Sequence, residues 1–184
     1  MPRLFVAVGL PTAATAELVR IQPPPTDGVR LVEPHQMHVT LHFIGEADVE
    51  RVAAALASVP AAAPPLTFEG VGQFPSAAGA VTLWAGVRRS PALLGLHAAV
   101  ATALAGEGFR PEARAYTPHV TLARCEPGVD RGVADEFLAR HAGFSLANVP
   151  AEGFRLCSSE FAGGAPVYRV ERSFRPRASA GGMA

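Results

Sequence analysis

Residues 38–41 read His-Val-Thr-Leu, and residues 119–122 repeat the same tetrapeptide. Each copy lies in a run where polar and apolar residues alternate, which is typical of a β-strand because successive strand side chains point to opposite faces. We therefore expect His38 and Thr40 to share one face of a strand, with Val39 and Leu41 turned into the core. The second copy is expected to place His119 and Thr121 in the same way.

In this repeat it is the histidines, rather than the Val-Thr-Leu part, that indicate a function. With 6 His in 184 residues, roughly 0.3 His-x-Thr pairs are expected by chance. A third Val-Thr-Leu, at residues 81–83, lacks the histidine, so the Val-Thr-Leu part alone is ordinary strand composition. Two matched histidines, in contrast, suggest an acid and a base in one site.

The composition predicts a globular protein of one domain, or of one domain with two lobes. The 184-residue chain is 49% hydrophobic and 17% charged, and its formal net charge is zero. Zero net charge argues against a long, non-specific nucleic-acid footprint. All sixteen positive charges are arginines, which favour forked contacts with phosphate oxygens, although genome composition is the simpler explanation. We expect a monomer.

Cysteine content and the N-terminal sequence predict a cytoplasmic protein. The two cysteines, Cys125 and Cys157, are too few for a disulfide framework and fit free thiols in a reducing compartment. The apolar run from Leu4 to Leu10 resembles a short signal peptide, but it is only seven residues long and serves equally well as a buried first strand. No stretch approaches the ~20 apolar residues of a membrane span.

Hydrophobic patterning and Gly/Pro punctuation predict a mixture of strands and helices. Helices are expected from Thr12, Asp48 and Asp130, each offering a capping oxygen, and from Pro91 to Ala105, with Ser90 as N-cap and Gly106 as a left-handed end. The hairpin-length and helix-length connections favour an α+β fold with mainly antiparallel sheets. We expect one domain over residues 1–176 and a disordered tail over 177–184. The expected strands are 4–9, 36–44, 66–71, 80–87, 117–124, 153–158 and 167–174.

Two strands carrying His-x-Thr would suit a small anion. Each strand presents an imidazole and a hydroxyl roughly 6–7 Å apart on one surface. Threonine hydroxyls can donate to phosphate oxygens, one neutral imidazole can accept a proton, and a protonated imidazole can donate one. The pattern therefore predicts metal-independent phosphate chemistry with no cofactor.

Other chemistries fit less well. His35, His38 and His42 cluster in the sequence, but His38 and His42 would lie about 13 Å apart in a strand, too far to share a metal ion. No G-x-S-x-G elbow indicates a serine hydrolase. Cys125 follows the second motif, but only Arg124 could lower its pKa, so a thiol nucleophile is a weak alternative.

The residues around both motifs resemble the 2H phosphoesterases, and within them the bacterial and archaeal RNA 2′,3′-cyclic phosphodiesterases, also called 2′-5′ RNA ligases. The resemblance rests first on the paired motifs in MHVTLHFIGE (37–46) and TPHVTLAR (117–124). It extends to RLFVAVGLP (3–11), TLWAGV (82–87) and PVY (166–168), and covers residues 3 to 176. One departure is that residues 79–81 (Gly-Ala-Val) lack the basic residue common there, which puts one substrate contact in doubt.

The resemblance implies a two-lobed, pseudo-duplicated α+β fold with antiparallel sheets lining a central cleft and helices outside. It also implies hydrolysis of the 2′,3′-cyclic phosphate of RNA or a nucleotide to a 2′-phosphomonoester, with 2′-5′ ligation as the reverse reaction. By analogy His38 is the general acid, His119 is the general base, and Thr40 and Thr121 hold the phosphate. Two alternatives remain: an RNA-end-binding module without turnover, and a phosphodiesterase for another cyclic phosphate or a 2′-5′ linkage.

Arg124 and Phe43 are the less certain members of this predicted site. Perfect alternation puts Arg124 on the face opposite His119 and Thr121, so a binding role for it requires a strand end or a bulge. Phe43 matches a family position near the bound base, but alternation places it with the core residues, so core packing is an equal alternative. His42 is expected on the His38 face as a solvated residue.

Overall fold

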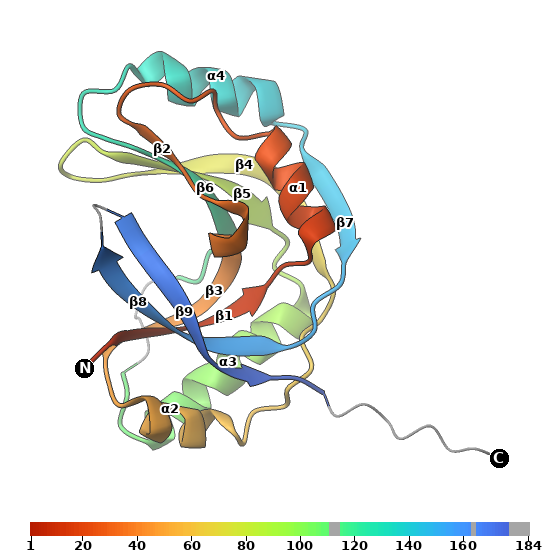
Figure 1. Cartoon of the computed structure of the whole chain (residues 1–184). Coiled ribbons are helices and arrows are strands. Elements are labelled where there is room, and N and C mark those ends of the chain that lie inside the picture. The colour runs from red at the N-terminus through yellow and green to blue at the C-terminus, as the bar shows by residue number, and fades with distance from the viewer. Residues whose placement is uncertain (111–114, 163–164, 177–184) are drawn as a thin grey trace.

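The computed structural model describes residues 1–110, 115–162 and 165–176. Two antiparallel sheets and four helices make up the fold (Figure 1). The first sheet has the strand order β3-β1-β8-β9, and the second has the order β2-β6-β5-β4-β7. In chain order the elements are β1 (Arg3–Gly9), α1 (Thr12–Arg20), β2 (Val29–Leu31), the 3-10 turn η1 (Pro34–Gln36), β3 (His38–Glu46), α2 (Val49–Leu56), β4 (Leu66–Pro75), β5 (Val81–Val87), α3 (Pro91–Gly106), β6 (His119–Cys125), α4 (Arg131–His141), β7 (Ser145–Val149), β8 (Phe154–Ala162) and β9 (Ala165–Phe174).

The structure confirms the predicted α+β class and every predicted strand and helix. Sequence reasoning missed the short strand β2, the turn η1 and the strand β7. β7 reads Ser-Leu-Ala-Asn-Val, which has no aromatic residue and only one β-branched residue, Val149, so it gives little strand signal. The predicted disordered tail, residues 177–184, lies outside the described residues.

The helix ends agree with the capping analysis at three of four N-termini. Ser90, Asp48 and Asp130 each accept a hydrogen bond from a first-turn backbone N–H. α1 begins at Thr12 as predicted, but the predicted cap was wrong, because Pro11 is the N-cap and no side chain caps the helix. The expected left-handed end at Gly106 was also wrong, because α3 runs through Gly106 and Gly108 takes the positive φ of 80°.

One apolar core spans both sheets, with fully buried residues from β1, β3, β5 and β6. The strands that carry the two motifs, β3 and β6, pack against one another across the two sheets. β3 is an edge strand of the first sheet, whereas β6 lies inside the second. The core thus brings two segments 81 residues apart to one place.

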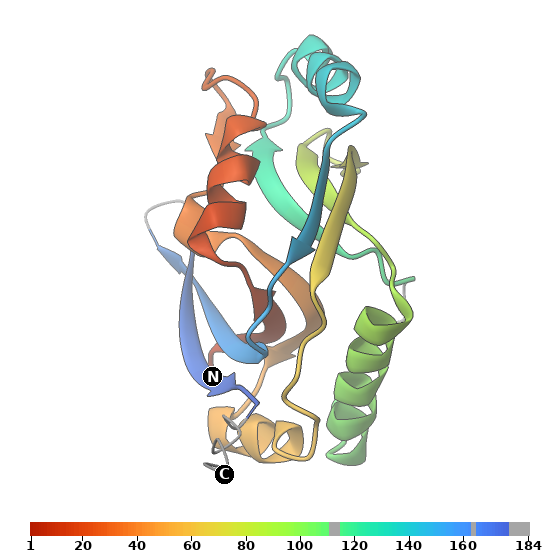
Figure 2. The ribbon, with the colours of Figure 1, turned by 90° about the vertical axis from the view of Figure 1, so that its right-hand side faces the viewer.

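Helices lie outside the sheets, as expected. α2 and α3 pack on one another at one end of the molecule, and α4 lies at the other (Figure 2). α3 also contacts β3, and α4 contacts β4. Because α3 directly precedes the chain that leads into β6, its packing on β3 helps to fix the two motif strands relative to each other. No helix in the described ranges is long and apolar enough to cross a membrane.

Candidate active site

Both motif strands show the predicted alternation over the tetrapeptide. Val39, Val120 and Leu122 are fully buried, and Leu41 is 3% exposed. The motif histidines and threonines are half-buried on the opposite face. Each strand therefore uses its apolar residues to anchor the motif in the core, and this packing holds the polar pair at the surface.

A β-bulge follows the threonine in both strands. In the pairing of β3 with β1, Thr40 faces Ala7 and His42 faces Val6, so Leu41 is the extra residue. In the pairing of β6 with β5, Thr121 faces Trp84 and Ala123 faces Leu83, which leaves Leu122 as the extra residue. A bulge inserts one residue and so reverses the alternation beyond it.

The bulges bring Phe43 and Arg124, each five residues after its motif histidine, to the motif face. Leu122 and Ala123 are both buried, and the next residue, Arg124, is exposed on the side of Thr121. The bulge at Leu122 is therefore the irregularity that a binding role for Arg124 requires. Phe43 is 53% exposed, so the core-packing alternative for Phe43 was wrong.

Both motif histidines are held by the same local contact. The Nδ1 atom of His38 lies 2.6 Å from the backbone oxygen of Gln36, and Nδ1 of His119 lies 2.7 Å from that of Thr117. A carbonyl oxygen can only accept, so Nδ1 carries the proton in each neutral ring. The arrangement therefore assigns proton transfer to Nε2 in both residues and fixes the ring orientations.

Aromatic rings flank each histidine. The ring centroid of His38 is 5.0 Å from Phe5 and 5.2 Å from Tyr168, and that of His119 is 4.9 Å from Phe74 and 5.9 Å from Trp84. Sequence reasoning missed Phe5, which reads as an ordinary residue of a buried strand. It also missed Phe74, which lies beyond the expected end of its strand at residue 71.

His38, His119 and Arg124 lie close enough to interact electrostatically. Burial is the largest influence on His38 and lowers its pKa, the hydrogen bond with Gln36 opposes this, and the positive charges of His119 and Arg124 lower it further, to about 4. Mutual repulsion between the two positive charges disfavours the pair with both histidines protonated, and so favours a pair that holds a single proton. One neutral and one protonated imidazole are what concerted acid–base catalysis needs.

The lowered pKa of His38 predicts an acid-tolerant activity. The singly protonated pair is lost on the acid side only when the second proton binds, so kcat/KM should fall near pH 4 rather than near the ordinary histidine value of about 6.5. The profile is the same whichever histidine holds the proton, because both arrangements are the same protonation state. We would measure kcat/KM from about pH 3 to 9, with circular dichroism to confirm folding. An acid limb centred at pH 6.5 would contradict the assignment.

His42 does not lie where alternation predicts. It is 3% exposed, and its ring stacks on His97 with centroids 4.1 Å apart. The bulge at Leu41 turns His42 into the core, so the expectation of a solvated residue on the His38 face was wrong. His97 in turn stacks on Tyr116 at 3.9 Å, and its pKa is lowered to about 4, first by burial and then by the charge of His42. This stack links β3 and the segment just before β6 to α3.

The described residues do not support the thiol-nucleophile alternative or the metal-site alternative. Cys125 is buried, and burial raises its pKa, which keeps the thiol protonated and poorly nucleophilic. His42 points into the core while His38 does not, so the two cannot share a ligand. The described residues contain no group of three His, Cys, Asp or Glu side chains placed to hold a metal ion.

Comparison with known proteins decides the family. The model of the 2′-5′ RNA ligase superfamily matches residues 10–157, which include both motifs. The chain belongs to the 2′-5′ RNA ligase superfamily. Two relatives named RNA 2′,3′-cyclic phosphodiesterase, from Archaeoglobus fulgidus and Thermus thermophilus, are 30% and 33% identical to it. The alignments cover 94% and 97% of this chain, and 99% and 92% of the relatives.

Solved members of the superfamily share the fold. The crystal structure of TT0787 from Thermus thermophilus matches with a TM-score of 0.73 and 28% identity, over 96% of this chain and 99% of that one. Escherichia coli LigT complexed with 3′-AMP matches with a TM-score of 0.70 and 27% identity, over 93% and 95%. LigT has also been solved with phosphate, and that structure matches with a TM-score of 0.64 and 26% identity.

Proposed function

We propose that this protein is an RNA 2′,3′-cyclic phosphodiesterase, which opens the cyclic phosphate at the end of an RNA or nucleotide to a 2′-phosphomonoester. One observation carries the proposal. Two His-x-Thr strands of one chain present matched imidazoles, each with Nε2 assigned to proton transfer by the contact at Nδ1. The relatives that match over most of the chain carry this activity in their name. Because both strands come from one chain, a monomer suffices. The free, buried cysteines Cys125 and Cys157 fit a reducing compartment such as the cytoplasm.

The reaction needs one proton acceptor and one proton donor. A neutral imidazole removes a proton from water as its oxygen attacks phosphorus, the P–O3′ bond breaks, and the protonated imidazole delivers its proton to O3′. The product keeps phosphate on O2′, and the two histidines have exchanged protonation states. Thr40 and Thr121 are the proposed donors to the non-bridging oxygens, whose negative charge grows in the transition state. Arg124 adds positive charge on the same face, and Phe43 offers a ring for stacking the base.

Two arguments assign the acid and base roles in opposite ways. The resemblance makes His38 the acid toward O3′ and His119 the base toward water. The lowered pKa of His38 keeps its imidazole neutral in the free protein at pH 7, which suits a base. Bound phosphate is negatively charged and favours protonated His38 again, so the role of His38 depends on its place relative to the leaving oxygen. The experiment that separates the two assignments is given in the Discussion.

Product analysis tests the proposal directly. The purified protein, incubated with 2′,3′-cyclic nucleotides and EDTA, should release only 2′-phosphates, because a site that holds the ribose in one orientation expels one oxygen. Chromatography separates the 2′ and 3′ isomers. Loss of turnover in EDTA that zinc or manganese restores would overturn the metal-free mechanism. A predominantly 3′-phosphate product would mean that the ribose binds in the reverse orientation. The two-histidine site would still stand.

The same assay separates the alternative functions. A protein that only binds RNA ends would retain cyclic-ended RNA without converting it. An enzyme for another cyclic phosphate, such as one on an ADP-ribose derivative, or for a 2′-5′ linkage would turn over that substrate faster than cyclic nucleotides. Incubating a cyclic-ended RNA with a 5′-hydroxyl RNA would reveal the reverse reaction as a 2′-5′-joined product.

A further inference from the structure

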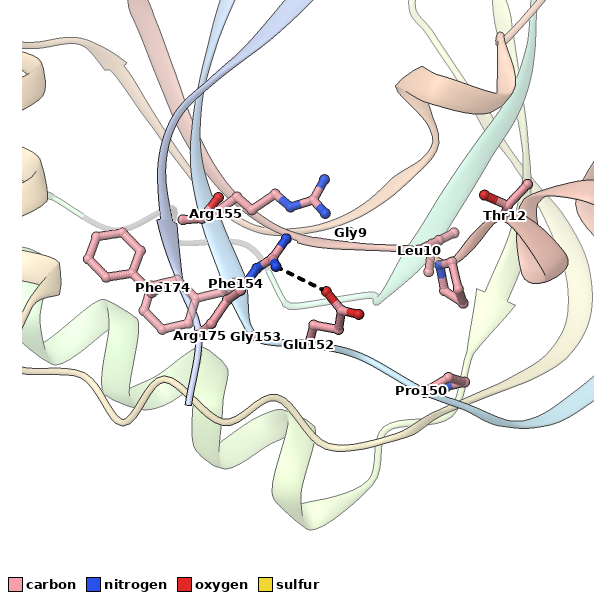
Figure 3. Close-up of a pocket in the computed structure, with 12 residues that line it drawn as sticks. Gly9, Leu10, Thr12, Pro150, Glu152, Gly153, Phe154, Arg155, Phe174 and Arg175 are labelled. Carbon is pink, nitrogen blue, oxygen red and sulfur yellow. Dashed lines mark ion pairs between the residues drawn. The ribbon is translucent and has the colours of Figure 1, made fainter. Parts of the chain in front are cut away.

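A cavity of about 260 Å³ lies beyond the end of β1, outside the two-histidine site (Figure 3). Two arginines and two hydroxyl residues contribute to its lining: Arg155, Arg175, Thr12 and Ser173. Arg175 pairs with Glu152 at 3.5 Å, and this pair is exposed. In Figure 3 the side chain of Arg155 instead extends toward Gly9 and Leu10, away from Glu152.

Arg155 belongs to the same sheet face as the first motif. It pairs with Ala7 across β8 and β1, and Ala7 pairs with Thr40 across β1 and β3. Three residues in register across adjacent strands share one face, so Arg155 lies two strand spacings, about 10 Å, from Thr40. On the far side, Arg155 pairs with Ser173, which lines the cavity.

Small residues let the Arg155 side chain lie along β1 toward the motif. A Cβ added at Gly9 would be 2.7 Å from Cζ of Arg155, so only glycine leaves room for the guanidinium there. Gly9 is also the strand partner of His38. A second, smaller cavity is lined by His38, Tyr168 and Arg155 together, so Arg155 borders both the motif histidine and the larger cavity.

The charge of Arg155 is not neutralised by any carboxylate that the structure describes. Within the described ranges, Arg155 makes no ion pair, whereas Arg175 beside it does. A half-buried guanidinium without a counter-ion, next to a proposed phosphate site, suits a second phosphate, because arginine presents a fork that matches phosphate oxygens. The cavity beyond it supplies further hydroxyl and guanidinium donors.

We propose that Arg155 and the cavity it lines bind the phosphodiester backbone of the RNA strand next to the cyclic end. This inference rests on the proposed function and names its substrate class: RNA ends and nucleotides with a 5′-phosphate, in preference to cyclic nucleosides with a 5′-hydroxyl. The strand would run from the two histidines across β1 and β8 into the cavity.

Three substrates and three variants test the proposal. The substrates are a cyclic mononucleotide with a 5′-hydroxyl, the same with a 5′-phosphate, and a cyclic-ended oligonucleotide. In Arg155→Met, KM for the oligonucleotide should rise about tenfold more than KM for the 5′-hydroxyl mononucleotide, as expected for one lost charge-assisted contact. Arg155→Lys should recover part of this difference. Arg140→Gln, a surface change in α4, is the matched control and should behave as the wild type.

Salt dependence gives a second readout. For a product oligonucleotide with a terminal 2′-phosphate, the slope of log K against log salt should become shallower by about 0.7 in Arg155→Met, the value for one lost phosphate contact on a single strand. If the 5′-phosphate lowers the KM of the mononucleotide most of the way to that of the oligonucleotide, Arg155 binds the first phosphate of the strand. If the 5′-phosphate does not lower this KM, Arg155 binds a phosphate further along the strand.

The outcomes separate this inference from the proposed function. Equal rises in KM for all three substrates, or no rise in any, would overturn the second phosphate site. A wild-type protein that converts none of the three substrates would instead refute the proposed function, whatever the binding results.

Discussion

Replacing His38 or His119 by alanine is expected to lower turnover of a 2′,3′-cyclic nucleotide by roughly 10²–10⁴-fold, the usual contribution of a positioned acid or base. Each ring is oriented by a backbone carbonyl through Nδ1, which leaves Nε2 of each available for the proposed proton transfer. The loss should appear mainly in kcat. Steady-state kinetics with a cyclic mononucleotide measure it.

The control is His141→Ala. His141 ends α4 and should tolerate the change with little effect on kcat. The double variant lacking both motif histidines should be far less impaired than the product of the single effects, because residues that act as a unit are not additive. Full activity in either single variant, or a loss in His141→Ala as large as theirs, would contradict the assignment.

A sulfur-substituted substrate distinguishes the acid from the base. In a cyclic analogue with sulfur in place of O3′, the leaving thiolate needs no proton, so the variant that lacks the general acid regains activity and the variant that lacks the base does not. If His38 is the acid, His38→Ala recovers on this analogue. Recovery of His119→Ala alone would assign the acid role to His119, as the lowered pKa of His38 suggests.

Replacing Thr40 or Thr121 by valine is expected to reduce kcat by roughly 10²–10³-fold, the effect of removing one donor that stabilises developing negative charge. Valine keeps the branched shape and the strand preference of threonine, so the fold should persist. Steady-state kinetics, with circular dichroism as the check on folding, give the answer.

Thr102→Ala is the control for the threonine variants, because Thr102 lies on an exposed part of α3 and bonds to the carbonyl of Ala98. Its kcat should match the wild type. A valine variant with unchanged kcat but a higher KM would mean that the hydroxyl binds the ground state as strongly as the transition state.

Periodicity predicted the parts of the fold and site that depend on strict alternation. Val39 and Val120 are buried while His38 and His119 are not, because these residues precede any irregularity in the strands. Helix starts followed from side-chain caps at Ser90, Asp48 and Asp130. At these positions the structure depends on the residue itself and its neighbours in the chain, so it can be predicted from the sequence.

Alternation failed where tertiary pairing overrides it. Nothing within residues 38–46 indicates that Leu41 will be extra in its pairing with β1, yet that single residue turns His42 inward and Phe43 outward. Arg155 was missed for a related reason. Its significance comes from three strands in register and from the open space at Gly9, and these strands are far apart along the chain.

The matched bulges and carbonyl contacts make the two motif strands close copies of one another, although a cyclic nucleotide has no such symmetry. Two identical strands cannot determine which imidazole faces the attacking water and which faces the departing oxygen. That distinction must come from what differs between the halves. The differences include Phe43 in one strand and Arg124 in the other, and Phe5 and Tyr168 beside one imidazole where Phe74 and Trp84 lie beside the other. In the proposed reaction, the surroundings of the two imidazoles therefore decide which oxygen leaves, and the repeated tetrapeptide supplies only the groups that transfer protons.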